Sequence, residues 1–296
     1  MASDEITIEG RTIKLSNLNK PLYPEFTKAQ VIDYFARIAP VLLPHTRGRA
    51  LTLKRYPDGA QGQFFYEKNS PKHRPEWVRT APIWSEGNKR FMDYTLANDT
   101  ATLVWLANLA SLELHTSLSL AKKPERPTMI VFDLDPGEPA TIVECAEVAL
   151  DIRKYAKHLH LEIFAKTSGS KGMQLYIPLN TSVTYDQTKV FSHALAMTME
   201  QAHPNGVVSK MAKVLRPGKI FIDWSQNDAH KTTVSVYSLR AMTEPTVSTP
   251  VTWAEVAKCA KGKALSFTAP EVLARVKKSG DLFAPVLSLK QKLPKV

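Results

Sequence analysis

The chain has 296 residues, of which 44% are hydrophobic and 23% are charged, a balance that excludes disordered, collagenous and coiled-coil proteins. Its 39 Lys and Arg residues outnumber 28 Asp and Glu residues, and the net charge of +11 favours a polyanionic partner such as nucleic acid. The two cysteines exclude a disulfide framework, and no run of about 18 apolar residues suits a membrane span. Because the first residues also lack the pattern of a secretory signal, we expect a soluble intracellular protein that enters no membrane.

The first 116 residues predict short strands separated by two helices. Apolar residues alternate over 4–15, which is typical of a hairpin, and Thr27 is placed to cap a helix with an apolar face. Asp99 or Thr100 is placed to cap a second helix. The remaining predicted elements are strands within 50–66, around the turn 56–59, and a strand over 112–116.

The second half of the chain mixes longer strands and helices. Predicted strands cover 128–134, 161–166, 173–179 and 219–224, and predicted helices cover 140–158, 185–202, 252–259 and 269–277. This mixture predicts an α/β or α+β fold with mixed central sheets flanked by helices. We expect residues 1–296 to form a single domain, with an N-terminal lobe 1–115 and a catalytic lobe 116–296.

Two carboxylates stand out at the end of the strand over 128–134. Asp133 and Asp135 are two residues apart, so in a strand both project from one face while Phe132 and Leu134 face the core. Adjacent carboxylates repel each other unless a cation lies between them, and a divalent ion such as Mg²⁺ or Mn²⁺ suits such ligands. A surface strand or turn without a metal is the alternative interpretation.

A third carboxylate, Asp223, lies in the apolar segment Ile220–Trp224. Aspartate is poorly suited to strands, so Asp223 is either a strand-end residue or a ligand. If it lies beside Asp133 and Asp135, the three complete a site for two metal ions, which is typical of phosphoryl transfer.

The segment 167–172 combines small residues with Lys171. Small residues allow backbone N–H groups to approach a phosphate, and Lys171 adds a positive charge. The segment lacks the Walker A pattern, and a plain hairpin turn is the alternative.

Basic residues surround these elements, and Phe64, Phe65 and Tyr66 form an aromatic run between basic stretches. Aromatic rings interleaved with cations suit base stacking and phosphate contact. The alternative is a strand with one ring in the core and the next on the surface.

Taken together, these segments resemble the polymerase domain of bacterial LigD and its stand-alone relatives in the archaeo-eukaryotic primase superfamily. The resemblance covers residues 15–293 and implies the archaeo-eukaryotic primase-like fold. The segments that carry it include NLNKPLYP (17–24), LTLKRYPDG (51–59), FFYEKNSPKHRPEWV (64–78), FDLDPG (132–137), TSGSKGMQLYIPL (167–179) and RPGKIFIDWSQND (216–228).

The resemblance implies a role for each matching residue. It makes Asp133, Asp135 and Asp223 the catalytic carboxylates that bind two Mn²⁺ or Mg²⁺ ions. The residues implied to bind the incoming nucleotide are Lys54, His115, Ser168, Lys171, Gln174, Arg216 and Arg240. Those implied to bind DNA are Phe64 and Phe65, which stack on template bases, and Lys20 and Lys28, which bind a downstream 5′-phosphate. Gln174 stands where the family usually has histidine, which removes a charge from the expected triphosphate contacts.

The implied function is a template-directed DNA/RNA nucleotidyltransferase, a primase-polymerase that fills gaps or extends ends in DNA double-strand-break repair and prefers ribonucleotides. Expected partners are gapped or broken DNA with a 5′-phosphate, NTP or dNTP, an end-binding Ku-like protein and a separate DNA ligase, in the cytoplasm of a prokaryote at the nucleoid. One alternative is a DNA-end-binding module of the same fold with weak or lost polymerase activity. Another, a sugar-nucleotide transferase with an Asp-x-Asp site, leaves Lys20, Lys28 and the Phe64–Phe65 pair without a role.

Overall fold

The computed structural model describes residues 4–294, which form two compact units. Unit 1 contains the chain up to Ser117 together with Thr232–Ser248 and Phe267–Asp281, and unit 2 contains Leu118–Lys231, Thr249–Ser266 and the chain from Leu282 onward. The chain first passes from unit 1 to unit 2 after Ser117, close to the lobe boundary expected after residue 115. However, two later segments return to unit 1, so two continuous lobes do not describe these units.

Unit 1 is built around a four-stranded sheet in the order β15-β9-β5-β6, in which every neighbouring pair is antiparallel. Three two-stranded sheets accompany it, and one of them is the predicted hairpin over residues 4–15. The strands are β1 (Asp4–Ile8), β2 (Arg11–Leu15), β3 (Pro21–Tyr23), β4 (Phe26–Thr27), β5 (Leu51–Arg55), β6 (Phe65–Glu67), β7 (Thr80–Ser85), β8 (Arg90–Thr95), β9 (Ser111–Thr116) and β15 (Thr233–Val234).

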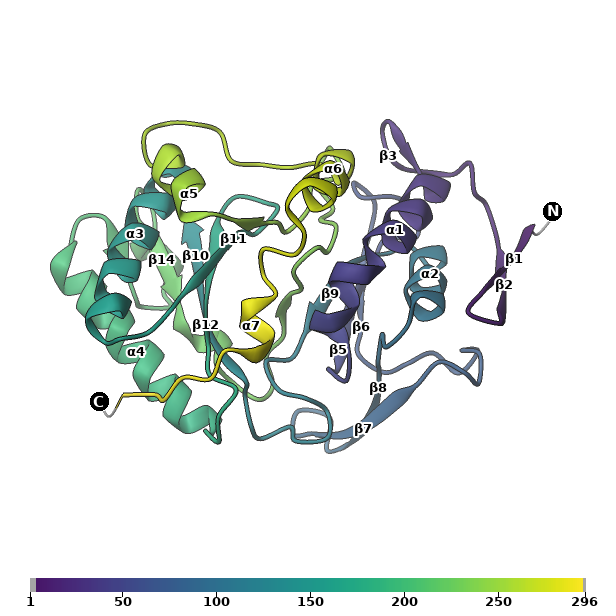
Figure 1. The fold of residues 1–296 in the computed structure, drawn as a ribbon, viewed down its shortest axis with the longest axis horizontal. Coiled ribbons are helices and arrows are strands. Elements are labelled where there is room, and N and C mark those ends of the chain that lie inside the picture. Colours follow the sequence, from purple (N-terminus) through teal and green to yellow (C-terminus); the bar gives the residue numbers. More distant parts are fainter. Residues whose placement is uncertain (1–3, 295–296) are drawn as a thin grey trace. The chain divides into compact units, whose positions relative to one another are not determined.

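Three helices pack together in unit 1: α1 (Lys28–Thr46), α2 (Thr100–Asn108) and α6 (Ala269–Ser279). Thr27 caps α1 and forms a reciprocal capping box with Gln30, as its position in the sequence predicts. The Asp99 side chain caps α2 by accepting from the Thr102 N–H. In Figure 1, α1 and α2 lie side by side, and α1 contacts both α2 and α6.

Unit 2 contains a six-stranded sheet in the order β13-β14-β10-β12-β11-β16, antiparallel except where β13 pairs with β14. The central strand β10 is buried along most of its length, as its apolar sequence predicts. The strands are β10 (Met129–Pro136), β11 (Phe164–Thr167), β12 (Met173–Pro178), β13 (Val207–Val208), β14 (Ile220–Asp223) and β16 (Pro250–Val251).

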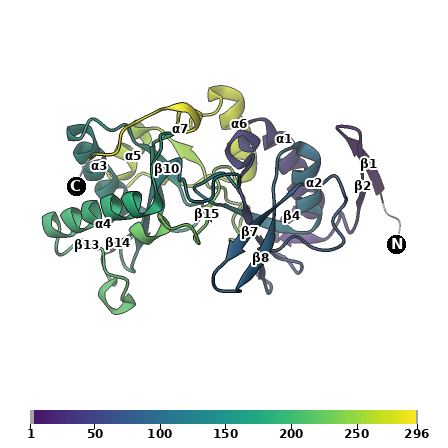
Figure 2. The same cartoon turned by 90° about the horizontal axis from the view of Figure 1, so that it is seen from below.

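The helices of unit 2 are α3 (Ile142–His158), α4 (Tyr185–Ala202), α5 (Trp253–Cys259) and α7 (Pro285–Ser288), with short 3₁₀ turns η1 (Lys213–Leu215) and η2 (Trp224–Gln226). Both α3 and α4 pack against β10, and α5 packs against α3 (Figure 1). Figure 2 shows α4 running beside β13, which it contacts. Helices α3 and α4 thus support the sheet at β10, the strand that carries the predicted carboxylates Asp133 and Asp135.

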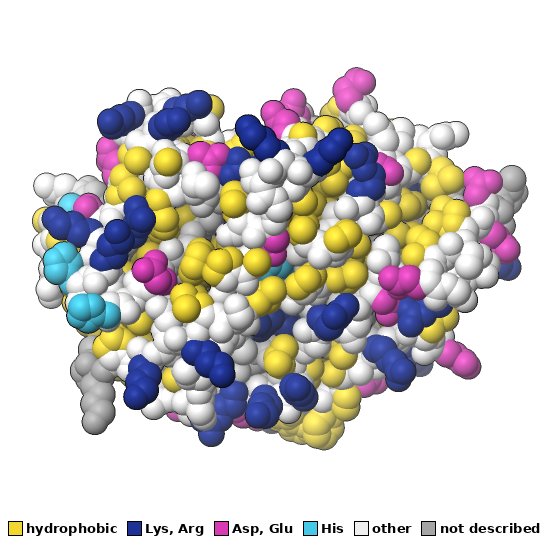
Figure 3. All heavy atoms as spheres, viewed as in Figure 1, with side chains coloured by type: hydrophobic (Ala, Val, Ile, Leu, Met, Phe, Trp, Pro, Cys, Tyr) yellow, Lys and Arg dark blue, Asp and Glu magenta, His cyan; other side chains and the backbone are white. Residues whose placement is uncertain are grey.

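The surface carries the positive charge that the composition predicts. Lys and Arg side chains occur across the visible face in Figure 3, interspersed with apolar ones. Within residues 4–294, no helix combines the length and the apolar character needed to cross a bilayer.

Candidate active site

Strand β10 positions the first two carboxylates. Phe132 and Leu134 are fully buried, and Asp133 and Asp135 alternate with them toward the end of the strand. This is the alternation that the sequence predicts, because successive strand residues point to opposite faces.

The third carboxylate lies beside the first. Asp223 is the last residue of β14, and the antiparallel register places it directly opposite Asp133. Directly opposed residues on neighbouring strands have their Cβ atoms about 4.5–5.5 Å apart. The structure therefore brings Asp223 next to Asp133 and Asp135, although Asp223 lies 88 residues after Asp135 in the sequence.

The electrostatics of Asp133 reflect this crowding. Burial, the neighbouring charge of Asp135 and that of Asp223 raise the pKa of Asp133 to about 7. A hydrogen bond from Gln174 and the charge of Lys166 act in the opposite direction. The cluster thus concentrates negative charge that a cation would relieve.

The three carboxylates supply oxygen ligands of the kind that hard divalent ions prefer. As the side chains stand, no group of three or more His, Cys, Asp or Glu within residues 4–294 closes around a common metal position. Both oxygens of Asp223 accept hydrogen bonds: Oδ1 from Ser225 N at 3.0 Å and Ser225 Oγ at 2.6 Å, and Oδ2 from Gln226 at 2.8 Å. The donor set fits a divalent ion, and Asp223 would exchange some of these hydrogen bonds for it.

Lys166 lies in line with Asp133 across the sheet, and the sequence-based reasoning missed this residue. Lys166 on β11 is opposite Gln174 on β12, which is opposite Asp133 on β10. The fully buried Lys166 donates from Nζ to Gln174 Oε1 at 2.6 Å, and the Tyr176 hydroxyl donates to the same oxygen at 3.3 Å. A charged residue in the middle of a four-residue strand is a signal that could have identified it.

Gln174, which was predicted to contact the triphosphate, lies between Lys166 and Asp133 on the intervening strand. Its side chain is only 2% exposed, and it donates to Asp133 while accepting from Lys166. The structure places it between a buried cation and a carboxylate, where histidine in the usual family pattern would stand.

The loop between β11 and β12 closes on Ser168. Ser168 Oγ accepts from the N–H groups of Ser170 and Gly172, each at 3.1 Å. A Cβ at Gly172 would lie 2.1 Å from the carbonyl oxygen of Leu134, so only glycine allows this loop to approach β10 so closely. The predicted phosphate-binding segment is thereby held next to the carboxylate strand.

The two predicted phosphate-binding cations of unit 2 are on the surface or close to it. Lys171 pairs with Glu138 at 2.7 Å, and both side chains are exposed, so this ion pair is weak in water. The Arg216 guanidinium donates to the Met211 carbonyl at 2.8 Å and lies 3.7 Å from the ring centroid of Phe221. The Arg216 carbonyl also approaches the position that a Cβ on Gly137 would occupy.

In unit 1, three predicted nucleotide ligands surround one carboxylate that the sequence-based reasoning missed. Glu113, only 3% exposed, lies 2.9 Å from His115 Nε2, 3.4 Å from Arg240 Nε and 3.8 Å from Lys54 Nζ. Burial alone would raise the pKa of Glu113, but His115, Arg240 and Lys54 outweigh burial and hold it well below its usual range. Burial lowers the pKa of His115. Lys54, His115 and Arg240 thus form one group around a buried acid.

The predicted template-stacking rings lie at the start of the edge strand β6. Phe64 and Phe65 are 49% and 44% exposed. Lys54 Nζ lies 3.9 Å from the Phe64 ring centroid, whereas the Arg55 guanidinium lies 5.0 Å from that of Phe65. Because Lys54 and Arg55 are consecutive in β5, the two rings pack on opposite faces of the sheet.

The two lysines predicted to bind a 5′-phosphate are close to each other. Burial and the charge of Lys20 lower the pKa of Lys28 to about 8. Lys28 donates to Ser16 Oγ at 3.2 Å, and Lys20 pairs with the exposed Asp58 at 3.0 Å. Two neighbouring ammonium groups favour binding of an anion.

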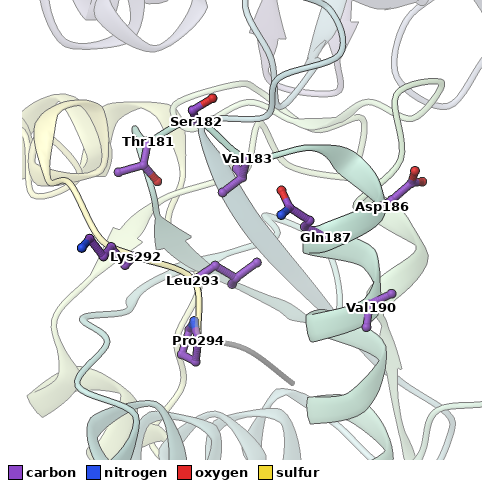
Figure 4. A pocket seen from close by; sticks show the side chains of 9 residues that line it. All are labelled: Thr181, Ser182, Val183, Asp186, Gln187, Val190, Lys292, Leu293 and Pro294. Carbon is purple, nitrogen blue, oxygen red and sulfur yellow. The ribbon is translucent and has the colours of Figure 1, made fainter.

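A separate pocket of about 750 Å³ lies between the start of α4 and residues 292–294. Figure 4 shows Val183, Gln187 and Leu293 around this space. None of the predicted site residues lines it.

Comparisons with known proteins agree with the resemblance. The sequence model of the family described as "LigD, primase-polymerase domain" matches residues 27–283. The chain is 41% identical over 278 residues to the multifunctional non-homologous end joining protein LigD of Mycolicibacterium smegmatis. It is 31% identical over 274 residues to the bifunctional non-homologous end joining protein LigD of Bacillus subtilis.

These relatives are much longer proteins. The alignments cover 93% and 92% of this chain but only 36% and 43% of the two relatives. Among solved structures, the polymerase domain from Mycobacterium tuberculosis Ligase D in complex with DNA matches with a TM-score of 0.87 and 37% identity. That match covers 93% of this chain and 98% of the other. The chain therefore belongs to the LigD primase-polymerase domain family, whose members are metal-dependent nucleotidyltransferases.

Proposed function

We propose that this chain adds nucleotides, directed by a template, to DNA at gaps and broken ends, and that it prefers ribonucleotides. The observation that carries the proposal is the carboxylate cluster: Asp133 and Asp223 opposite each other on neighbouring strands, with Asp135 two residues along. Support also comes from the related polymerase domain, whose solved structure is a complex with DNA.

Asp133, Asp135 and Asp223 are the residues that would hold two Mn²⁺ or Mg²⁺ ions. When bound, such ions stabilise negative charge on the attacking and leaving oxygens of a phosphoryl transfer. Among the chain's own residues, Gln174 orients Asp133 by a hydrogen bond, and Ser225 and Gln226 orient Asp223.

Positively charged residues serve nucleotide binding in this proposal, and each unit is described by itself. In unit 2, Lys171 and Arg216 supply charge, and the backbone of the loop closed on Ser168 supplies N–H groups, to stabilise the triphosphate. In unit 1, the corresponding residues are Lys54, His115 and Arg240, which Glu113 holds together.

The proposed DNA contacts come from two groups of side chains on unit 1, exposed aromatic rings and a pair of lysines. Phe64 and Phe65 present exposed rings for unpaired template bases, and Lys20 and Lys28 form a pair of cations suited to a 5′-phosphate. A pair of lysines distinguishes a phosphorylated 5′ end from a hydroxyl end because only the former carries charge.

The wider setting is a further part of the proposal, because the chain spans 36% of the length of the Mycolicibacterium relative. That relative and its Bacillus counterpart are named as non-homologous end joining proteins. We propose that this chain acts in the same repair process, in the bacterial cytoplasm at the nucleoid, with a Ku-like end-binding protein and a separate ligase activity.

One observation favours a second candidate, a DNA-end-binding module with weak or lost polymerase activity. Three hydrogen-bond donors already occupy the two oxygens of Asp223, so metal binding there competes with the native contacts.

Extension of a 5′-phosphorylated gapped duplex, with each nucleotide type and with Mn²⁺ or Mg²⁺, separates the two candidates. We expect the parent protein to extend the primer and prefer ribonucleotides, and Asp133→Ala and Asp223→Ala to abolish extension while leaving DNA binding largely intact. Asp151→Ala, which removes an exposed ion pair with His203, serves as the control and should extend normally. DNA binding without extension by the parent protein would favour the end-binding module.

A further inference from the structure

The pairing between β14 and β10 stops at the carboxylates. Its last pair sets Asp223 opposite Asp133, and the chain then turns directly into η2. Val131 lies two residues before Asp133 on β10, and residues two apart in an antiparallel strand present their backbone N–H and C=O groups to the same neighbour. Strand β14 therefore ends before it reaches Val131.

The side chain of Asn227 takes the place of a strand residue opposite Val131. Its Oδ1 accepts from Val131 N at 2.9 Å, and its Nδ2 donates to Val131 O at 2.7 Å and to Trp224 O at 2.9 Å. A carboxamide carries an acceptor and a donor in one plane, as a peptide group does, so it completes the two bonds that an antiparallel partner would form. Asn227 is fully buried, so these bonds are not shared with solvent.

These bonds fix one end of the turn that holds Asp223. The turn η2 occupies Trp224–Gln226, between Asp223 and Asn227. Within it, Ser225 and Gln226 donate to the two oxygens of the Asp223 carboxylate. The turn is thus tied to β10 at both ends, by the strand pairing of Asp223 and by the side chain of Asn227.

Other contacts of η2 go to different parts of unit 2. The Trp224 ring stacks on His193 of α4, with ring centroids 4.0 Å apart, and its Nε1 donates to Ser209 O at 3.0 Å. Neither contact reaches β10, so they cannot by themselves set where the turn lies against the strand of Asp133.

We propose that Asn227 is a positioning residue of the candidate active site, which holds Asp223 opposite Asp133 so that the two carboxylates can share divalent ions. The inference rests on the proposed function and adds to it a residue that acts through Asp223. The two carboxylates repel each other, and Asp223 is the one that stands at the end of its strand, next to a turn. The bonds between Asn227 and the backbone of β10 oppose its displacement and keep the cluster assembled before a cation binds.

The test measures Mn²⁺ binding to the whole chain without DNA or nucleotide, from the electron paramagnetic resonance signal of the unbound ion. Asn227→Leu has a similar volume and removes the hydrogen bonds of the carboxamide. We expect the Kd for Mn²⁺ to rise about tenfold, within the usual cost of losing the hydrogen bonds that support a metal ligand.

Asn108→Leu is the matched control, because the carboxamide of Asn108 also bridges backbone groups, in unit 1. It accepts from Ser16 N at 3.1 Å and donates to Lys14 O at 2.9 Å. This variant should lose stability, as Asn227→Leu does, and should bind Mn²⁺ like the parent.

Asn227→Asp keeps the test decisive if the thermal unfolding midpoint shows that Asn227→Leu does not fold. The aspartate keeps the shape and the acceptor for Val131 N, and it loses the donor to Val131 O. Its added negative charge attracts a cation, so weaker binding of Mn²⁺ reports a displaced ligand rather than a lost charge. We expect binding to weaken several-fold.

A folded Asn227 variant that binds Mn²⁺ as tightly as the parent, or more tightly, would overturn the positioning role. An equal loss of affinity in Asn108→Leu would also overturn it, because lower stability alone would then explain the effect. Asp133→Ala separates these failures from failure of the proposed function. A parent protein that binds no more Mn²⁺ than Asp133→Ala would overturn the metal site itself, whereas a parent that binds Mn²⁺ through Asp133 but does not depend on Asn227 would overturn this inference alone.

Discussion

At the residue scale, two buried charged side chains organise the groups that the sequence points to. Lys166 lies in the same sheet as Asp133 and is linked to it through Gln174. Glu113 lies next to Lys54, His115 and Arg240. Burying a charge is costly unless an opposite charge or hydrogen bonds compensate for it, so each of these residues depends on its neighbours and constrains them in turn.

Gln174→Leu tests this dependence. The change leaves Lys166 without the 2.6 Å acceptor of its ammonium group and Asp133 without a donor. We expect the free energy of unfolding to fall by about 2–4 kcal/mol, because removing one partner of a buried charged group exposes the full cost of its desolvation. Urea denaturation measures the change, and Gln201→Leu at an exposed position of α4 provides the control. A loss no larger than that of the control would mean that water replaces the amide.

The lowered pKa of Lys28 predicts a pH dependence of DNA binding. The proposed contact between Lys28 and a 5′-phosphate requires the protonated lysine, and its pKa of about 8 places the loss of that proton just above neutral pH. We therefore expect the preference for 5′-phosphorylated over 5′-hydroxyl gaps to be steady below about pH 7 and to decrease as the pH rises through 8 and beyond. A bound phosphate favours the charged lysine and moves the decrease upward.

The measurement is the ratio of the two Kd values between pH 6.5 and 9.5. Lys28→Arg keeps its charge throughout this range, so the variant should lose the pH dependence. A parent protein whose preference stays constant to pH 9.5 would show that Lys28 is not part of the phosphate contact.

At the scale of elements, a glycine sets the distance between the β11–β12 loop and β10. A Cβ added at Gly172 would lie 2.1 Å from the Leu134 carbonyl oxygen, which is backbone and cannot move aside easily. We expect Gly172→Ala to lower the free energy of unfolding by about 1–3 kcal/mol, the usual cost of overpacking, and to reduce nucleotide addition strongly. Gly206→Ala is the matched control, because a Cβ there meets nothing within 4 Å. Equal stability and activity of both variants would show that the loop shifts without consequence.

The elements themselves were largely predictable from the sequence. The helix over 185–202 has the observed bounds. Thr27 was identified as a cap, and Asp99 was one of two candidates for the second, because side-chain caps depend only on nearby residues. The strand predicted over 161–166 begins later, at Phe164: Leu161 and Ile163 are buried but do not join the ladder. The apolar character of Leu161 and Ile163 predicted that they are buried, but it could not predict whether their backbone pairs with a neighbouring strand.

The candidate site was only partly predictable for the same reason. Alternation placed Asp133 and Asp135 on one face, because that rule is local to one strand. The register that sets Asp223 and Gln174 opposite Asp133 depends on three strands from separate parts of the chain. Lys166 and Glu113 acquire their meaning only from those pairings, so the sequence presented them as ordinary charged residues.

At the scale of the whole molecule, both units depend on distant segments of the chain. In unit 1, β15 completes the four-stranded sheet, and α6 packs on α1. Asp281 accepts from the Tyr237 hydroxyl at 2.7 Å and lies 2.8 Å from His45 Nε2. The boundary after Ser117 therefore does not mark an independent folding unit.

A fragment ending at residue 117 tests this conclusion. It lacks β15, α6 and the residues that bury one side of α1, so we expect it to show no cooperative unfolding transition in urea. Circular dichroism at increasing urea concentration measures this, with the whole chain as the comparison. A sharp transition with the stability of the parent would show that the later segments are dispensable for the fold of unit 1.

The discontinuous make-up of unit 1 also affects how the protein is made. A ribosome releases the chain from its N-terminus, and domains generally fold as units as they emerge. Unit 1 is not complete until the segment ending at Asp281 has been synthesised. Before then the apolar face of α1 lacks its partner α6, and until residue 234 has emerged β9 lacks β15 along one edge. Nascent chains should therefore bind holdase chaperones until residue 281 has left the ribosome, and slowing the ribosome before that point should prolong the association rather than help unit 1 to fold early.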